Sequence, residues 1–443
     1  MQKHFPATPA EALEISPALR FVMSTVCKCA DTFGFWSLPA KGAATDFPEM
    51  TLLDKIYWVY KSSRPTVLGE KGEYDERYFH ENSKVGIGLP AGFEKGSSVT
   101  LGAMGDLVKT DGLEKSKDLL YEEVADLVFD QDISFANLES QLTSSEVVKE
   151  VLSDRESPIE CCSFEQYEAV KGHCGRNFTI MNTACNHTLD MGVEGVETTL
   201  RQLERDAIID LGTHREPSEQ GKGKIILKNG IRIGFAAVTF GLNGKEVPKG
   251  KEYVVDVARL LPKAGEADLS LIKRQIDWCR LEGCDFIIAS LHWGYEFELF
   301  PRERQVAIAH ELVEYGADAI IGHHPHVVQP VECYRPRRDN SRLAVIAYSL
   351  GSLTWSFSAP HLVLSAILNL TLAKGRFQGE EKTYIERVDV VPVYHARRET
   401  AGGTAVSIRR LYGGQANGDG RETPEYIAGI KRFAELVFGA RLK

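Results

Sequence analysis

The chain lacks any long hydrophobic run. No stretch of its 443 residues approaches the roughly 20 consecutive apolar residues that a membrane-spanning helix needs. Its first residues, MQKHFPATPAEALEIS, also lack the hydrophobic core of a signal peptide. We therefore expect a soluble, cytoplasmic protein without a transmembrane segment.

The chain also has fewer positively charged residues than negatively charged ones. The chain has 52 Lys and Arg against 62 Asp and Glu, which gives a net charge of -10 and a pI near 5.7. No basic stripe alternates with aromatic residues, as a nucleic-acid-binding surface would require. These features argue against nucleic acid as a partner and against a nuclease.

The number and spacing of the cysteines do not indicate a disulfide framework. The nine cysteines are odd in number and irregularly spaced, which fits a reducing compartment. Cys27 and Cys29, and the adjacent Cys161 and Cys162, have no second CxxC partner, so a structural zinc site is not expected. The content of 43% hydrophobic and 26% charged residues is typical of a globular enzyme.

What the chain does have is a group of histidines that follow two short apolar runs. SLHWGYEF (290–297) contains His292, and DAIIGHHPHVVQ (318–329) contains three more. Apolar positions between Arg302 and Tyr315 predict a helix between the two runs. A parallel strand, helix, strand unit brings both strand ends to one edge of a sheet, so we expect these histidines to meet.

Three earlier predicted strands also end in polar side chains. VTLGAMGDLV ends near Asp106, DISFANLES carries Asn137 and Glu139, and NFTIMNTACNHTLDMG carries Asn186 and His187. Helices are expected between the strands, including one from Ser116 to Phe129, and KIILKNGIRIGFAAVTF predicts a hairpin on an Asn-Gly turn. The alternation indicates an α/β fold with its chemistry at the strand ends.

Carboxylate, carboxamide and imidazole groups in this mixture suit two divalent ions of Mn, Fe or Zn. Such a pair favours phosphate-ester hydrolysis by a metal-activated hydroxide. Each residue type also has an ordinary structural use: Asp106 as a cap, Glu139 as a solvated loop residue and Asn186 as a turn former. Arg215 near such a site would suit an anionic substrate, and Trp293 would line its pocket.

The order of motifs resembles that of the CapA family, the poly-γ-glutamate capsule biosynthesis proteins, within the calcineurin-like metallophosphoesterase superfamily. The resemblance runs from about Val99 to Leu372 and rests on GDLV, FANLES, NTACNHTLDMG, SLHWGYEF, GADAIIGHHPHVVQPVE and YSLGS. It implies a four-layer αββα sandwich with a dinuclear metal site at the strand ends. The implied metal ligands are Asp106, Glu139, Asn186, His292, His324 and His326.

The same resemblance makes His187 and Asp106 the catalytic residues, with His187 stabilising the transition state or protonating the leaving group. The expected substrate-binding residues are His323, Arg215, Trp293 and Asn137. Two motifs depart from the pattern. Val108 stands where the usual Asp-x-His motif has histidine, so one metal position loses an imidazole. Ser352 stands where the usual SLGN motif has asparagine.

We divide the chain into an appended helical or irregular segment (1–97), a CapA-like metallophosphoesterase domain (98–398) and a C-terminal loop and helix (399–443). The leading hypothesis is a phosphoesterase acting on a small or polymeric anionic substrate. One alternative is a hydrolase or transferase of γ-glutamyl amide bonds in poly-γ-glutamate metabolism. Another alternative is a non-catalytic capsule-assembly factor. A homo-oligomer is compatible with each of these three hypotheses.

Overall fold

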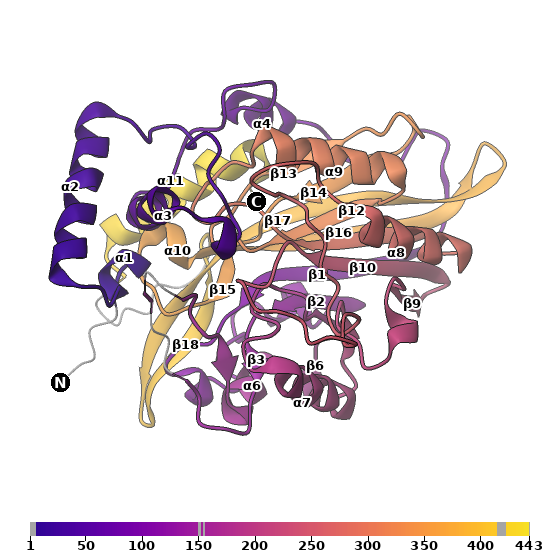
Figure 1. Cartoon of the computed structure of the whole chain (residues 1–443). Coiled ribbons are helices and arrows are strands. Elements are labelled where there is room, and N and C mark those ends of the chain that lie inside the picture. The colour runs from indigo at the N-terminus through magenta and orange to yellow at the C-terminus, as the bar shows by residue number, and fades with distance from the viewer. Residues whose placement is uncertain (1–5, 149–151, 154–155, 414–421, 443) are drawn as a thin grey trace.

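Two β-sheets packed face to face form the body of the protein (Figure 1). The computed structural model describes residues 6–148, 152–153, 156–413 and 422–442. The sheets are joined by side chains such as Phe135 and Phe235, whose rings stack with centroids 6.4 Å apart. Helices lie outside the sheets, so the fold is a mixed α/β sandwich and the expected fold class is confirmed.

The larger sheet has eight strands in the order β18-β17-β16-β1-β2-β7-β8, with β15 paired to β1. The central strands β1, β2, β7 and β8 are parallel, while β16 to β18 form an antiparallel extension. The strand bounds are β1 Glu94–Leu107, β2 Ile133–Leu138, β7 Ile180–Asn182, β8 Ile209–Leu211, β15 Ser352–Thr354, β16 Leu364–Phe377, β17 Glu380–Thr400 and β18 Gly403–Arg410.

The smaller sheet has six strands in the order β13-β14-β12-β11-β10-β9. Its four inner strands are parallel, and the edge strand β9 joins β10 through the expected turn, where Asn229 and Gly230 both have positive φ. The strand bounds are β9 Lys224–Lys228, β10 Ile231–Thr239, β11 Phe286–His292, β12 Ala319–His323, β13 Val331–Tyr334 and β14 Ala344–Ala347.

The helices between the strands follow the apolar periodicity of the sequence. α8 packs against β10 and β11 of the smaller sheet, and α7 packs against β8 of the larger one. These helices and the others of the central region are α5 Ala125–Val128, α6 Phe164–Val170, α7 Gly192–Arg205, α8 Ser270–Leu281, α9 Glu303–Tyr315 and α10 Pro360–Val363. Short elements complete this region: β3 Gln141–Leu142, β4 Cys161–Cys162, β5 Gly172–His173, β6 Arg176–Asn177, η2 Leu113–Lys115 and η3 Pro217–Glu219.

The N-terminal segment is helical and packs on the same body. In Figure 1 its helices lie at one side of the sandwich, near the C-terminal helix. The bounds are α1 Pro9–Ala12, α2 Pro17–Phe33, η1 Phe47–Glu49, α3 Leu52–Ser63 and α4 Glu76–Asn82, with α11 Pro424–Phe438 and η4 Gly439–Arg441 at the other end. A capping box between Thr51 and Asp54 fixes the start of α3.

The structure corrects two expectations. The helix predicted from Ser116 to Phe129 is only the single turn of α5, because Asp118 has φ +59° and Ser116 Oγ bonds to the chain at Gly112. The C-terminal part does not begin as a loop at residue 399, since the β17-β18 hairpin runs to Arg410. The Gly-rich stretch GGQANGDG (413–420), in the part expected to be a loop and a helix, lies outside the described residues except for Gly413. Among the described residues, no helix is long and apolar enough to cross a membrane.

Candidate metal centre

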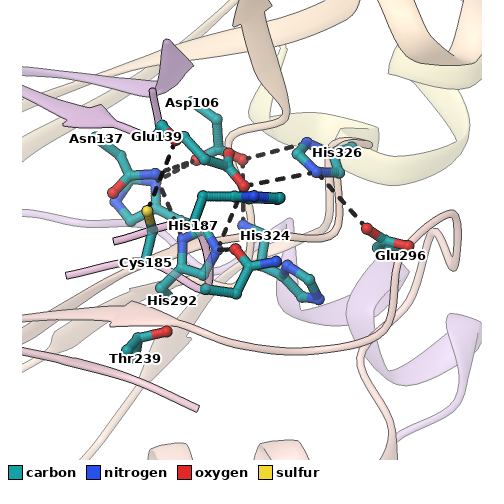
Figure 2. A network of polar contacts seen from close by, with 12 residues as sticks. Asp106, Asn137, Glu139, Cys185, His187, Thr239, His292, Glu296, His324 and His326 are labelled. Carbon is teal, nitrogen blue, oxygen red and sulfur yellow. Dashed lines mark hydrogen bonds and ion pairs between the residues drawn. The ribbon is translucent and has the colours of Figure 1, made fainter. Parts of the chain in front are cut away.

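Four strands from the two sheets end at one place. Asp106 on β1 lies level with Asn137 on β2, and His292 on β11 lies level with His323 on β12. Parallel strands share a carboxyl edge, so the polar residues after each strand face the same space. Figure 2 shows the side chains of Asp106, Asn137 and His292 converging with those of Glu139, His324 and His326.

The turn after β12 has the backbone needed to aim two histidines at this space. His324 and His326 have φ values of +95° and +56°, in a backbone region that residues other than glycine rarely adopt. Such strained backbone concentrates at functional sites, where the surrounding structure holds it. Gly322, just before the turn, lies so close to β14 that a Cβ would be 1.9 Å from the carbonyl oxygen of Tyr348.

Asp106 is the most connected carboxylate of the cluster. Its Oδ1 accepts a hydrogen bond from Asn137 Nδ2 at 2.9 Å and lies 3.1 Å from His323 Nδ1. Its Oδ2 accepts the backbone N–H of His324 at 3.2 Å and lies 3.7 Å from His326 Nδ1. Asp106 therefore joins the larger sheet to the histidine turn of the smaller one.

Glu139 lies between histidines of different strands. Its Oε1 is 3.5 Å from His292 Nε2 and 3.7 Å from His326 Nε2. Within the described part of the chain, neither carboxylate oxygen receives a hydrogen bond, and both ring nitrogens of His324 are also buried without one. Unpartnered buried polar atoms are costly, and a divalent cation would accept lone pairs from the carboxylate and the neutral imidazole together.

At this centre, three groups of described side chains offer ligand atoms that lie within 4.8 Å of one another. The groups are Glu139, His292 and His324; Glu296, His324 and His326; and Asp106, Glu139 and His326. The donor set of oxygen and imidazole nitrogen fits Mn, Fe or Zn, so the residues present fit a divalent metal site.

The electrostatics of the cluster favour ligand-ready histidines. Burial lowers the pKa values of His292 and His324 well below the ordinary value and lowers that of His326 to about 4. These imidazoles are therefore neutral near pH 7, as metal ligation requires. Burial, with the nearby charge of Asp106, raises the pKa of Glu139 well above its ordinary value. A cation among these groups would relieve that cost.

The remaining expected residues of the centre lie beside this cluster. Asn186 Oδ1 is 2.7 Å from His292 Nε2, and its amide nitrogen donates to Asn243 Oδ1 at 3.2 Å. His187 Nδ1 lies 2.6 Å from Asp190 Oδ2, and His187 Nε2 lies 3.5 Å from Asn243 Nδ2. The bond to Asp190 orients the His187 ring and directs Nε2 away from that carboxylate.

A cavity opens over one side of the cluster. Its floor includes Glu139, Asn186, His187, His324 and His326. Asp106 and His292 are fully buried beneath this floor. The cavity is the natural place for a substrate, since ligand sites are concave and carry a few convergent polar groups.

The four expected substrate-binding residues are not among the described residues that line this cavity. Asn137 and His323 are fully buried, and both contact Oδ1 of Asp106. Trp293 is fully buried and stacks on Tyr348, because the residue after β11 turns into the core. Arg215 points to the surface, where its guanidinium lies 2.8 Å from a carboxylate oxygen of Glu204 on α7.

Sequence reasoning missed Glu296 and the role of Ser352. Glu296 Oε1 lies 3.8 Å from His326 Nε2 at the edge of the cavity, and burial raises its pKa to about 7. Its signal was its place four residues after His292 in the same motif. Ser352 stands where the usual SLGN motif has asparagine. Its Oγ lies 2.8 Å from His326 Nδ1 and so orients that ring. Val108 lines the cavity.

A mixed α/β sandwich with this cluster at its strand ends defines a protein of the metallophosphoesterase-like class. Residues 100–355 match the family model described as "Bacterial capsule synthesis protein PGA_cap". This match covers more than half of the chain, and the chain belongs to that family.

Curated relatives agree with this assignment. The chain is 28% identical over 279 residues to the "PGA biosynthesis protein CapA" of Bacillus subtilis, a match covering 62% of this chain and 67% of that protein. It is 31% identical over 200 residues to the "Capsule biosynthesis protein CapA" of Bacillus anthracis, covering 42% of this chain and only 43% of that protein.

A solved structure gives a weaker likeness. The putative 5'-nucleotidase from Staphylococcus aureus, solved with alpha-ketoglutarate, is 12% identical, with a TM-score of 0.39 over 67% of this chain and 54% of that one. The fold assignment therefore rests on the sheets described above.

Proposed function

We propose that this protein is a metal-dependent hydrolase that cleaves phosphate esters. The observation that carries the proposal is the convergence of carboxylates and histidines from both sheets under one cavity, where Glu139 and His324 have no hydrogen-bond partner for their side chains among the described residues. The proposed metal-holding residues are Asp106, Glu139, Asn186, His292, His324 and His326. Two divalent ions of Mn, Fe or Zn, when bound, would supply Lewis-acid activation of water and neutralise charge on the substrate.

His187 is the proposed general acid. It lines the cavity, and Asp190 accepts a hydrogen bond from its Nδ1, which leaves Nε2 for the substrate. During hydrolysis the oxygen of water bonds to phosphorus and the bond from phosphorus to the leaving oxygen breaks. A doubly protonated His187 gives its Nε2 proton to that oxygen, and one proton of the attacking water is released and restores the imidazolium. Asn243 lies beside the same ring atom, with its Nδ2 3.5 Å from Nε2.

The direct test is turnover of diphenyl phosphate, whose phenolate leaving group needs a proton, by protein loaded with Mn²⁺. We expect His187→Ala to lower kcat by about 10²-fold or more, as for loss of other general acids, while the bound metal measured by elemental analysis is unchanged. His80→Ala, at an exposed histidine of α4, is the matched control and should keep full activity. An unchanged kcat in His187→Ala would refute the role of His187, and a lack of turnover with every metal would refute the phosphoesterase.

A second candidate reaction keeps the metal and changes the bond. Two relatives carry names of poly-γ-glutamate or capsule biosynthesis, which favours hydrolysis or transfer at γ-glutamyl amide bonds. The same water attack would then occur at a carbonyl carbon. Turnover of γ-glutamyl-p-nitroanilide but not of phosphate esters would select this reaction. Metal binding with turnover of neither would favour a capsule-assembly factor.

A further inference from the structure

The outer wall of the cavity comes from the N-terminal segment, outside the span that the family model matches. This wall is almost entirely apolar. We call it the N-terminal wall, and its apolar lining residues are Pro9, Leu13, Ile15, Leu19, Met23, Phe47, Met50, Leu52, Trp58 and Val59. The same cavity reaches the metal centre, because His187, His324 and His326 line it as well. Apolar surface and polar centre therefore belong to one continuous space.

The N-terminal wall is bound firmly to the loop that follows β11. Trp58 Nε1 donates a hydrogen bond to Glu296 Oε2 at the cavity edge. Lys61 is buried and lies 3.0 Å from Glu298 Oε1. Thr66 makes two backbone hydrogen bonds of 3.0 Å to the residues on either side of Glu298. The wall is thus a built part of the site.

Away from the metal centre, the side chains that line the cavity offer little positive charge to a polyanion. Lys55 supplies the one cationic side chain among the described lining residues, and its ammonium lies over the ring of Phe47, 4.2 Å from the centroid. Apart from the proposed metal ligand Glu139, the lining carboxylates are Glu156, Glu160 and Glu296. An anionic chain such as poly-γ-glutamate would place repeated negative charges against this surface, and like charges at short range repel.

We infer that the substrate is a small amphiphile: a compact anionic head at the metal centre, joined to an apolar alkyl or aryl group that the N-terminal wall holds. The inference deepens the proposed function and rests on it for the identity of the head. Burial of each methylene against the wall would raise affinity by up to about fourfold. The N-terminal wall would therefore determine which esters this chain accepts.

The test compares the binding of ethylphosphonate and hexylphosphonate, which cannot be hydrolysed, to Mn²⁺-loaded protein. Fluorescence of Trp58 and Trp355, which line the cavity, reports binding. We expect hexylphosphonate to bind at least about tenfold more tightly than ethylphosphonate. This factor is smaller than full burial of the four additional methylenes would give. Leu52→Asp should bring the ratio close to one.

Leu53→Asp is the matched control. Leu52 and Leu53 are neighbours in the first turn of α3 with exposed fractions of 59% and 62%, but only Leu52 lines the cavity. An acidic side chain suits that turn of a helix in both variants, so both should fold. Leu53→Asp should keep the hexyl-to-ethyl ratio of the native protein.

Equal affinity for the two phosphonates in the native protein would overturn the inference. So would an equal loss of the ratio in Leu53→Asp, or tighter binding of oligo-γ-glutamate that displaces hexylphosphonate. Because binding is measured without turnover, failure to hydrolyse any ester would refute the proposed reaction while the chain-length ratio still supports the apolar wall. Ester hydrolysis without a chain-length preference would support the reaction and refute the wall.

Discussion

At the scale of single residues, Glu298 shows how the N-terminal helices are tied to the site. Its carboxylate accepts hydrogen bonds from Lys61 at 3.0 Å and from two nitrogens of Arg302 at 2.8 Å. Burial alone would raise the pKa of Glu298, but the two cations outweigh it and lower the pKa to about 2. The guanidinium of Arg302 also lies over the ring of Tyr295, 3.7 Å from its centroid.

Replacing Glu298 with Gln would leave two buried cations without their anion. We expect Glu298→Gln to lower the free energy of unfolding by about 3 to 5 kcal/mol at pH 7. Because the folded pKa lies below the ordinary value, the native carboxylate stabilises fully above about pH 4.5 and loses this effect as the pH falls toward 2. The difference between native and variant protein should therefore shrink in acid.

Urea unfolding at pH 7, 5 and 3.5 measures this difference. Glu81→Gln, at an exposed ion pair with Lys84, is the control and should change stability little at any of these pH values. A deficit in Glu298→Gln that is the same at pH 7 and pH 3.5 would show that the buried charge is not its source.

At the scale of elements, the contact between β1 and the turn before β15 positions Asp106. Gly105 precedes Asp106, and a Cβ at Gly105 would lie 1.9 Å from the carbonyl oxygen of Gly351. The neighbour is backbone, so it cannot move aside without shifting the strand. Asp106 itself pairs with Ser352 across this contact.

Gly105→Ala should therefore separate the two strands. We expect a loss of at least about 2 kcal/mol in the free energy of unfolding and weaker Mn²⁺ binding, measured by denaturant titration and calorimetry. Gly88→Ala is the control, because no heavy atom lies within 4 Å of the Cβ it would add. Native stability in Gly105→Ala would mean that the strands can part without cost.

At the scale of the whole molecule, the candidate centre connects the two sheets. Asp106 and Glu139 come from the larger sheet, whereas His292, His324 and His326 come from the smaller one. A cation shared by these residues binds only when both sheets are folded and packed together. Its binding free energy is therefore added to the stability of the fold.

We expect Mn²⁺ at 100 times its Kd to raise the free energy of unfolding by about 2.7 kcal/mol, and EDTA to reverse the gain. Asp106→Asn should greatly reduce this stabilisation, as measured by thermal unfolding with and without metal. Asp118→Asn controls for the exposed group of Asp118, His173 and Cys174, and it should retain the full shift. A shift lost in Asp118→Asn and kept in Asp106→Asn would place the metal at that surface group.

The sequence by itself determined the elements around the centre. Short apolar runs that end in polar residues predicted β1, β2, β7, β11 and β12, and the parallel crossover from β11 to β12 predicted that the ends of these two strands would meet. The structure brings Asp106, Glu139, His292 and His326 within a few ångströms of one another. Such patterns are readable because each one lies within about ten neighbouring residues.

Only the tertiary structure decided what surrounds the centre. It turned Trp293 into the core, brought Glu296 to His326, reduced the helix expected at Ser116 to a single turn and set the N-terminal wall over the cavity. No local pattern records that Trp58 contacts Glu296 from 238 positions away. Such contacts form only when remote surfaces pack, because packing selects among local conformations of nearly equal free energy.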